Sequence, residues 1–390
     1  MSVGKTTSGL RHANSSVRLD ADPGLLVLAQ SSPQTVLSGA TPRLIDEWQL
    51  APDLWNALRH ELDARRDPGQ FILAGSASPA DEVTRHSGAG RIGRLRIRPM
   101  SLAESLESTG DVSLSHLLSG TDLVAGLAKL TVPDYASLIV RGGWPGLVTR
   151  RNADSARFLS NYLDNAARLD LNLIPGAPRR DPQRVMALMR ALARNLATEA
   201  SLTLLGREAG GGSPLAPTTV RSYIDDLARL YVLEELPAWR AHLRSKIRLR
   251  VQPTWHFADP SLAAALLDAG ESHLLSEPLT LGFFFESLAI RDLRVYSGAN
   301  RASVYHYRDD SGLEVDAVIE SRDGSWIAVE IKLGGQPLIE SAARNLQKLA
   351  AKVTEAKRDA LRNLVVITAG QTSYTRDDGV HVVALGNLTA

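Results

Sequence analysis

Arg43-Leu44-Ile45-Asp46-Glu47 is an apolar stretch that ends in two adjacent carboxylates. Its apolar residues favour a β-strand, and apolar residues at helical spacing between residues 54 and 62 predict a helix directly after it. Further candidate strands precede and follow this stretch, at Ser16–Asp20, Phe71–Gly75 and Arg94–Arg98. Strands that alternate with helices indicate a parallel sheet of the α/β class.

The two carboxylates have the position of a Walker B element, at the end of a buried strand. In such an element Asp46 would hold Mg²⁺ through water, and Glu47 would orient or deprotonate the attacking water. Acidic residues are also common at the N-terminus of a helix, and a helix is expected directly after them. The pair therefore fits either a nucleotide site or a helix cap.

A second motif lies near the N-terminus, where Gly4-Lys5-Thr6-Thr7 matches the end of the phosphate-binding loop G-x-x-x-x-G-K-[ST]. In that loop backbone N–H groups surround the phosphates, the lysine reaches the β- and γ-phosphates, and the next hydroxyl ligates Mg²⁺. We therefore expect Gly4, Lys5, Thr6 and Thr7 to bind nucleotide, with Thr6 and Asp46 on the metal.

Two more segments extend the predicted nucleotide site. Phe71–Ser76 is an apolar strand that ends in small polar residues, which makes Ser76 a candidate sensor of the γ-phosphate. A basic, glycine-rich loop follows, and from it Arg91 could approach a γ-phosphate, in cis or from a neighbouring subunit. A solvated basic loop is the alternative. Elements of this kind, in this order on strand ends of a parallel sheet, predict ATP binding.

The middle of the chain, from about residue 121 to 240, reads mostly helical. Long helices are expected over 153–170 and 181–200, and Thr218 or Thr219 can cap another. Together with a predicted strand at Tyr231–Trp239, this order favours a winged-helix-like pattern. The basic run from Arg240 to Arg250 is then either a wing that contacts DNA or a solvated hairpin.

The C-terminal part is predicted to be an α/β or α+β unit, with a helix at 281–294 and another at 338–354. Between them, Asp316 lies on one expected strand and Glu330-Ile331-Lys332 on the next. This is the pattern of the PD-(D/E)xK nuclease fold. Glu286, Asp316 and Glu330 are candidate metal ligands, and Lys332 a candidate to orient the nucleophile. Charged residues on the wet face of a sheet are the alternative.

Composition narrows the function classes. The 390 residues contain no cysteine, which excludes disulfides, thiolate nucleophiles and cysteine-ligated metal centres. With 44 Lys and Arg against 43 Asp and Glu, the net charge of +1 gives no broadly basic surface for nucleic acid. No stretch is apolar enough to cross a membrane and no signal peptide is visible, so a cytoplasmic protein is expected.

Together these motifs resemble those of the prokaryotic AAA-type ATPases that carry a C-terminal domain of unknown function. The resemblance covers nearly the whole chain and includes Arg98-Pro99-Met100-Ser101-Leu102 and Phe257-Ala258-Asp259-Pro260. It implies ATP binding in the first domain and a restriction-endonuclease-like fold in the last. We expect a P-loop ATPase domain over 1–120, a helical and winged-helix-like region over 121–254, and a nuclease-like domain over 255–390.

The N-terminus departs from this family, whose members have a strand and a complete glycine-rich loop before Gly-Lys-Thr. Either the start is assigned too far downstream or the loop is degraded. The survival of Lys5, Thr6, Asp46 and Glu47 favours the first explanation. We therefore expect this chain to bind ATP poorly and an upstream extension to restore binding.

Three hypotheses for the function follow. The leading one is a Mg²⁺-dependent ATPase coupled to the nuclease-like domain, with DNA or a protein as partner and with oligomerisation left open. The second is a metal-dependent DNA nuclease that a weak or inert nucleotide-binding domain regulates. The third is a non-catalytic interaction module.

Overall fold

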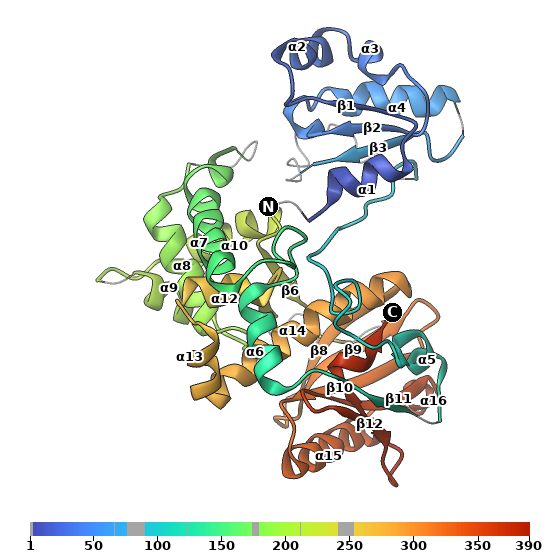
Figure 1. Ribbon diagram of the computed structural model, residues 1–390, viewed down its shortest axis with the longest axis vertical. Coiled ribbons are helices and arrows are strands. Elements are labelled where there is room, and N and C mark those ends of the chain that lie inside the picture. The colour runs from blue at the N-terminus through green and yellow to red at the C-terminus, as the bar shows by residue number, and fades with distance from the viewer. Residues whose placement is uncertain are drawn as a thin grey trace. The chain divides into compact units, whose positions relative to one another are not determined.

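The computed structural model describes residues 3–65, 67–75, 90–122, 124–173, 179–210, 212–240 and 253–390 (Figure 1). The chain divides into two compact units. The first comprises Met1–Arg98, Asp164–Pro182 and Tyr223–Val232, and the second comprises Pro99–Leu163, Gln183–Ser222 and Leu233–Ala390. None of the helices in the described ranges is long and apolar enough to span a bilayer.

The N-terminal sheet is parallel, as the sequence predicts. Its strands are β1 (Ser15–Arg18), β2 (Arg43–Asp46) and β3 (Phe71–Ala74), and they lie in that order. The register pairs Arg18 with Asp46 and Asp46 with Ala74, so the carboxyl ends of the three strands meet at one edge. An α/β fold with a parallel sheet is thus confirmed.

The prediction of a fourth strand at Arg94–Arg98 is wrong. These residues form no strand in the structure. The segment alternates arginines with Leu95 and Ile97, and the side chain of Leu95 is 88% exposed. Because one face of the segment carries only charged side chains and the other is not buried, the segment gains little from joining a sheet.

Helices cover both faces of this sheet (Figure 1). On one face α1 (Lys5–His12) packs against β2, where the Cα of Gly9 lies so close to Leu44 that a Cβ would come within 2.9 Å of Leu44 Cδ1. Successive strand residues point to opposite faces, so Ile45 faces the other way and packs in a core that the remaining helices share. These helices are α2 (Pro23–Ser31), α3 (Pro33–Leu37) and α4 (Leu54–Arg65).

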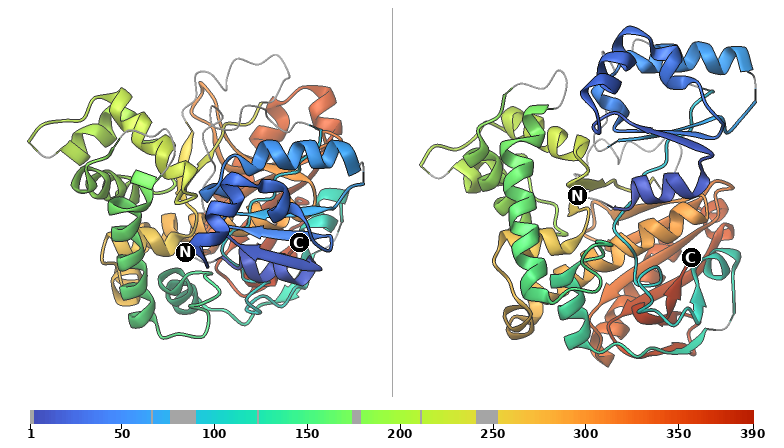
Figure 2. Two further views of the ribbon diagram at one scale, coloured as in Figure 1. Left: turned by 90° about the horizontal axis from the view of Figure 1, so that it is seen from above. Right: turned by 45° about the horizontal axis from the view of Figure 1, so that its top comes forward.

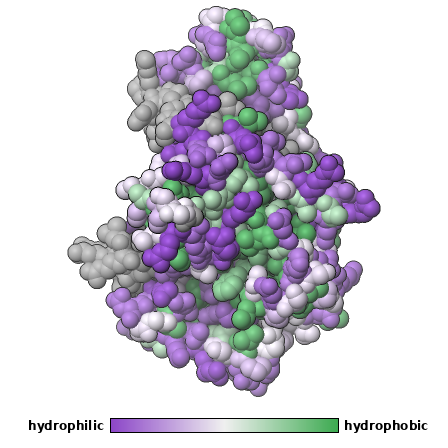
Figure 3. Space-filling view, turned by 90° about the vertical axis from the view of Figure 1, so that its left-hand side faces the viewer, coloured by the Kyte–Doolittle hydropathy of each residue, from purple (hydrophilic) through white to green (hydrophobic). Residues whose placement is uncertain are grey.

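Figure 3 shows hydrophobic surface at the end of this unit that α2 and α3 form. Helix α2 is apolar around much of its circumference, and its Val27 side chain is 62% exposed.

The middle of the chain is helical, as expected. Its helices are α6 (Val132–Arg141), α7 (Asn152–Arg168), α8 (Pro182–Arg194), α9 (Leu202–Gly210), α10 (Pro217–Arg229), α12 (Pro260–Leu266) and α13 (Glu271–Ser276). After α10, strands β6 (Leu233–Leu236) and β7 (Thr254–Phe257) pair in antiparallel fashion. This order is compatible with a winged helix, and the assignment stays a prediction. The basic run from Arg240 to Arg250 lies outside the described residues except for Arg240.

The C-terminal elements follow the predicted order closely. Helix α14 (Pro278–Ala299) precedes the antiparallel strands β8 (Ala302–Arg308), β9 (Glu314–Ser321) and β10 (Trp326–Lys332). Helices α15 (Gln336–Lys352) and α16 (Glu355–Asp359) then lead into β11 (Leu361–Thr368), which runs parallel to β10. Figure 2 shows α14 lying across these strands, which it contacts through β8, β9 and β10. The restriction-endonuclease-like assignment is not established by this order.

The sheet is larger than the sequence indicated. Seven strands lie in the order β5-β12-β13-β11-β10-β9-β8. The added strands are β5 (Ala125–Leu127), β12 (Thr372–Thr375) and β13 (His381–Ala384). A separate parallel pair joins β4 (Val112–Ser113) to β14 (Leu388–Thr389). Residues on both sides of the expected boundary at 120 therefore pair with the C-terminal segment.

A buried cluster of charges attaches α14 to two loops. Arg291 on α14 contacts Asp259 Oδ2 at 2.8 Å and Asp292 Oδ1 at 2.6 Å, and none of these three side chains is more than 3% exposed. Asp259 accepts a hydrogen bond from the backbone N–H of Gly143, and Asp292 accepts one from that of Leu102. We call this the Arg291 cluster. Two of the segments that it joins, at Leu102 and Asp259, belong to motifs on which the family resemblance rests.

Candidate nucleotide site and carboxylate cluster

The Gly4–Thr7 motif forms the start of α1. Gly4 is the N-cap and adopts a left-handed conformation (φ 88°), which glycine adopts without steric cost. Lys5 and Thr6 are the first two helical residues. The first N–H groups of a helix have no partner inside it and carry partial positive charge, so this end of α1 favours an anion.

Thr6 and Asp46 meet although forty residues separate them in the chain. The Thr6 Oγ1 hydroxyl donates a hydrogen bond to Asp46 Oδ2 at 2.8 Å. Asp46 is 1% exposed, and its other oxygen, Oδ1, is buried without a hydrogen-bond partner among the described residues. A buried carboxylate oxygen without a partner costs free energy, so this atom is suited to bind a ligand.

Lys5 and Glu47 complete the cluster. Burial lowers the pKa of the Lys5 ammonium, while the nearby carboxylates of Glu47 and Asp46 act in the opposite direction. Glu47 follows the end of β2 in a left-handed conformation (φ 55°), and Gln49 Nε2 donates a hydrogen bond to its carboxylate. A left-handed non-glycine residue is strained, and such strain is common at functional sites. The structure thus brings together the residues of the two predicted motifs.

The oxygens present fit a hard cation. Thr6 Oγ1 and the two oxygens of Asp46 are the donor types that Mg²⁺ binds, directly or through water. The unpartnered Oδ1 of Asp46 supports this fit.

Two other predicted residues are not brought to this edge. Ser76 lies outside the described residues. Arg91 forms an ion pair with Asp63 near the end of α4. Because α4 runs from the carboxyl edge of β2 back toward the start of β3, Asp63 is at the opposite end of the sheet from Asp46. The described position of Arg91 therefore does not support contact with a γ-phosphate.

Sequence reasoning missed Arg18, which the structure places at the carboxyl edge. Its Nε lies 3.7 Å from Asp46 Oδ2, and its Nη2 lies 3.1 Å from Asp20 Oδ2. The sequence signalled only that it lies within the predicted strand Ser16–Asp20, which the structure ends at Arg18.

The C-terminal candidates also cluster, across β9 and β10. The Lys332 ammonium lies 2.8 Å from Asp316 Oδ2 and 2.6 Å from Glu330 Oε2. The backbone N–H of Ile331 donates to Asp316 Oδ2 at 2.7 Å. Trp326 and Ala328 precede Glu330 and Lys332 on the same face of β10 and pack in the core beneath α15.

This cluster holds more negative than positive charge. Burial raises the pKa of Glu330 to about 8, and the Asp316 carboxylate adds to the shift. Burial and then Asp316 also raise the pKa of Glu286 on α14 well above its ordinary value. One Lys332 ammonium cannot compensate three neighbouring carboxyl groups, so at least one of them is favoured in its neutral form.

The C-terminal residues do not fit a metal as they are placed. Within the described part of the chain, no three His, Asp or Glu side chains are arranged to hold one. The Lys332 ammonium occupies the space between Asp316 and Glu330 where a cation would bind. The metal-ligand roles of Glu286, Asp316 and Glu330 therefore stay predictions.

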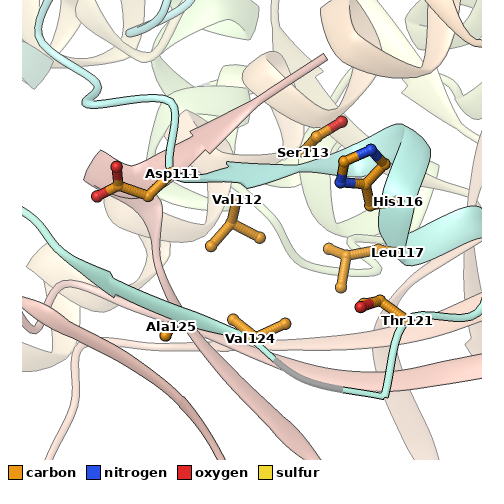
Figure 4. Close-up of a pocket in the computed structure, with 8 residues that line it drawn as sticks. All are labelled: Asp111, Val112, Ser113, His116, Leu117, Thr121, Val124 and Ala125. Carbon is orange, nitrogen blue, oxygen red and sulfur yellow. The ribbon is translucent and has the colours of Figure 1, made fainter.

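A pocket elsewhere holds none of the predicted residues. It measures about 60 Å³ and lies between β4, α5 (Leu114–Ser119) and β5. Figure 4 shows the polar side chains of Asp111, Ser113, His116 and Thr121 around its rim.

Comparison with known proteins finds a matching family model for each of three regions. Residues 2–106 match the family model of an AAA domain, which places a P-loop AAA-type domain at the N-terminus. Residues 281–388 match a domain of unknown function (DUF4143), and residues 132–273 match another (DUF8612). These matches confirm two parts of the resemblance, the AAA-type domain at the N-terminus and the domain of unknown function at the C-terminus.

Two mycobacterial proteins are similar to most of this chain. The uncharacterised proteins Mb2031c of Mycobacterium bovis and Rv2008c of Mycobacterium tuberculosis are each 27% identical to this chain over 379 residues. The match covers 94% of this chain and 77% of each relative. No solved structure matches this chain.

Proposed function

We propose that the N-terminal unit binds ATP with Mg²⁺ and hydrolyses it. The observation that carries this proposal is the hydrogen bond of Thr6 to the buried Asp46, whose second oxygen has no partner among the described residues. The hydroxyl belongs to the Gly4–Thr7 motif and the carboxylate to the Walker B-like stretch that ends β2. The AAA domain match over residues 2–106 supports the proposal independently.

Each residue then has a distinct role. The first N–H groups of α1 and the Lys5 ammonium would bind the phosphates, and burial of Lys5 strengthens that attraction. Thr6 and Asp46 would hold Mg²⁺, which neutralises phosphate charge when it is bound. Glu47, at the end of β2, would accept a hydrogen bond from the attacking water and orient it.

Calorimetric titration and phosphate-release assays test this proposal. Lys5→Ala is expected to weaken ATP binding about tenfold or more, because a charge-assisted contact is lost. Glu47→Gln is expected to retain binding but slow hydrolysis roughly a hundredfold. Arg11→Ala, on the exposed last turn of α1, is the matched control and should change neither quantity. Unchanged ATP affinity in Lys5→Ala would overturn the proposal.

We propose a nuclease-like C-terminal domain as a second candidate function. The meeting of Asp316, Glu330 and Lys332 on adjacent strands favours it, since these residue types recur at that spacing in the PD-(D/E)xK fold. A divalent cation would have to displace the Lys332 ammonium from between the two carboxylates. Incubation with plasmid DNA and Mg²⁺ or Mn²⁺ tests it. Cleavage that Asp316→Ala abolishes would support the proposal. Absence of cleavage, or equal cleavage by the variant, would contradict it.

A further inference from the structure

We infer that Arg18 is a further residue of the nucleotide site and contacts the terminal phosphate of ATP. The inference rests on the proposed ATP binding and extends it to a side chain that neither motif contains. Arg18 is the last residue of β1 and is paired in register with Asp46 on β2. It therefore lies at the carboxyl edge of the sheet, where ligands bind in parallel α/β folds.

The contacts of Arg18 are of the kind that a ligand can replace. Its side chain is 56% exposed, and its contact with Asp20 at 3.1 Å is a surface ion pair. Its Nε lies 3.7 Å from Asp46 Oδ2, which is beyond hydrogen-bond distance, and that oxygen already accepts the Thr6 hydroxyl. Exposed ion pairs contribute little to stability, so turning the guanidinium toward a phosphate costs little.

The charge balance of the site supports a second cation. Asp46 and Glu47 place two carboxylates near the position expected for the phosphates, and Lys5 supplies one positive charge. A planar guanidinium binds phosphate oxygens through paired N–H donors, and arginines stabilise the charge that develops during phosphoryl transfer. Arg91, the arginine expected for this role, is paired with Asp63 at the other end of the sheet.

The test compares Mg²⁺-ATP with Mg²⁺-ADP, because only ATP has the terminal phosphate. In Arg18→Ala the affinity for ATP should fall about tenfold while the affinity for ADP is unchanged. Hydrolysis should slow roughly a hundredfold or more. Arg18→Lys should recover part of the preference for ATP. The melting temperature should stay within about 2 °C of the unaltered protein, because the side chain is exposed.

The remaining outcomes separate this inference from the proposed function. Equal losses for ATP and ADP would mean that Arg18 only orders Asp46, and would overturn the inference. If Lys5→Ala weakens ATP binding and Arg18→Ala does not, the inference fails and the proposed function stands. If the unaltered protein binds neither nucleotide, both fail. Arg11→Ala is the control for loss of an exposed positive charge.

Discussion

Gly143 is a residue whose identity the packing dictates. A Cβ at this position would lie 2.1 Å from the backbone oxygen of Met100 and 2.9 Å from Arg291 Nη1. The carbonyl cannot move freely, because the backbone N–H of Met100 in turn donates to the oxygen of Gly143 at 2.6 Å. The loop between α6 and α7 and the segment at Met100 therefore approach each other only if residue 143 has no side chain.

Gly143→Ala is accordingly expected to destabilise the second unit by about 2 kcal/mol or more, since backbone must shift to admit the methyl group. Chemical denaturation followed by tryptophan fluorescence measures the change. Gly146→Ala is the matched control, because a Cβ there meets nothing within 4 Å. Equal stability of the two variants would contradict the steric argument.

His256 should make the second unit sensitive to acid. Its side chain is 1% exposed, and its Nδ1 lies 3.2 Å from Ser287 Oγ. Burial, and then the charges of Arg294 and His306, lower the pKa of the imidazole well below its ordinary value. Below about pH 6.5 the unfolded chain takes up a proton that the folded chain does not, so stability falls as the pH falls.

The expected slope from this one group is about 1.4 kcal/mol per pH unit below pH 6.5. His256→Gln keeps a polar side chain that does not titrate, so its unfolding free energy should lose this part of the pH dependence. Denaturation of both proteins at intervals from pH 7.5 to pH 5 gives the difference. Parallel pH profiles would show that His256 is not the responsible group.

At the scale of elements, α14 is held in place by buried charge as well as by apolar contacts. The Arg291 cluster places one guanidinium between Asp259 and Asp292, and the pKa of the Asp292 carboxyl is raised by burial although Arg291 opposes this. Loss of the cation would leave two buried carboxylates without their charged partner.

Arg291→Met should therefore lower the unfolding free energy of the second unit by about 3–5 kcal/mol. Arg151→Met is the control, because Arg151 and Asp154 form an exposed pair at the start of α7, within the second unit. Its loss should cost less than about 1 kcal/mol. Denaturant titration distinguishes the two variants, and a small effect of Arg291→Met would mean that the cluster is not a determinant of stability.

Individual helices and strands were predicted better than the pairing between strands. Helix α15 and strand β10 were predicted from the periodicity of their apolar residues, because this periodicity depends only on which face of the element is buried. The short strands β4 and β5 carry no such signal, since they contain two and three residues. Their place is set by hydrogen bonds to strands that lie about 250 residues or more away in the chain.

At the scale of the whole molecule, the C-terminal residues complete structure that begins near residue 110. Strand β14 pairs with β4, and Asn387 Nδ2 donates hydrogen bonds to Thr109 Oγ1 at 2.8 Å and to Asp111 Oδ2 at 3.1 Å. Removal of residues 387–390 should release residues 109–119 from these contacts.

Hydrogen exchange of the full-length and shortened chains tests this expectation. Amides of β4 and α5 should exchange at least about tenfold faster after the deletion, while those of β1, β2 and β3 keep their rates. Faster exchange throughout the N-terminal sheet would show that the two units unfold together. Unchanged exchange in β4 and α5 would contradict the proposed dependence on β14.

The sequence by itself determined the parallel N-terminal sheet, most elements of the C-terminal unit and most of the candidate residues that cluster at the two sites, because periodicity and short motifs are local properties of a chain. Only the tertiary structure decided which distant groups meet. It placed Arg18 rather than Arg91 beside Asp46, and it placed Lys332 between two carboxylates. Such contacts depend on strand order and on packing between side chains that are far apart in the chain, and neither can be predicted from the local spacing of residues.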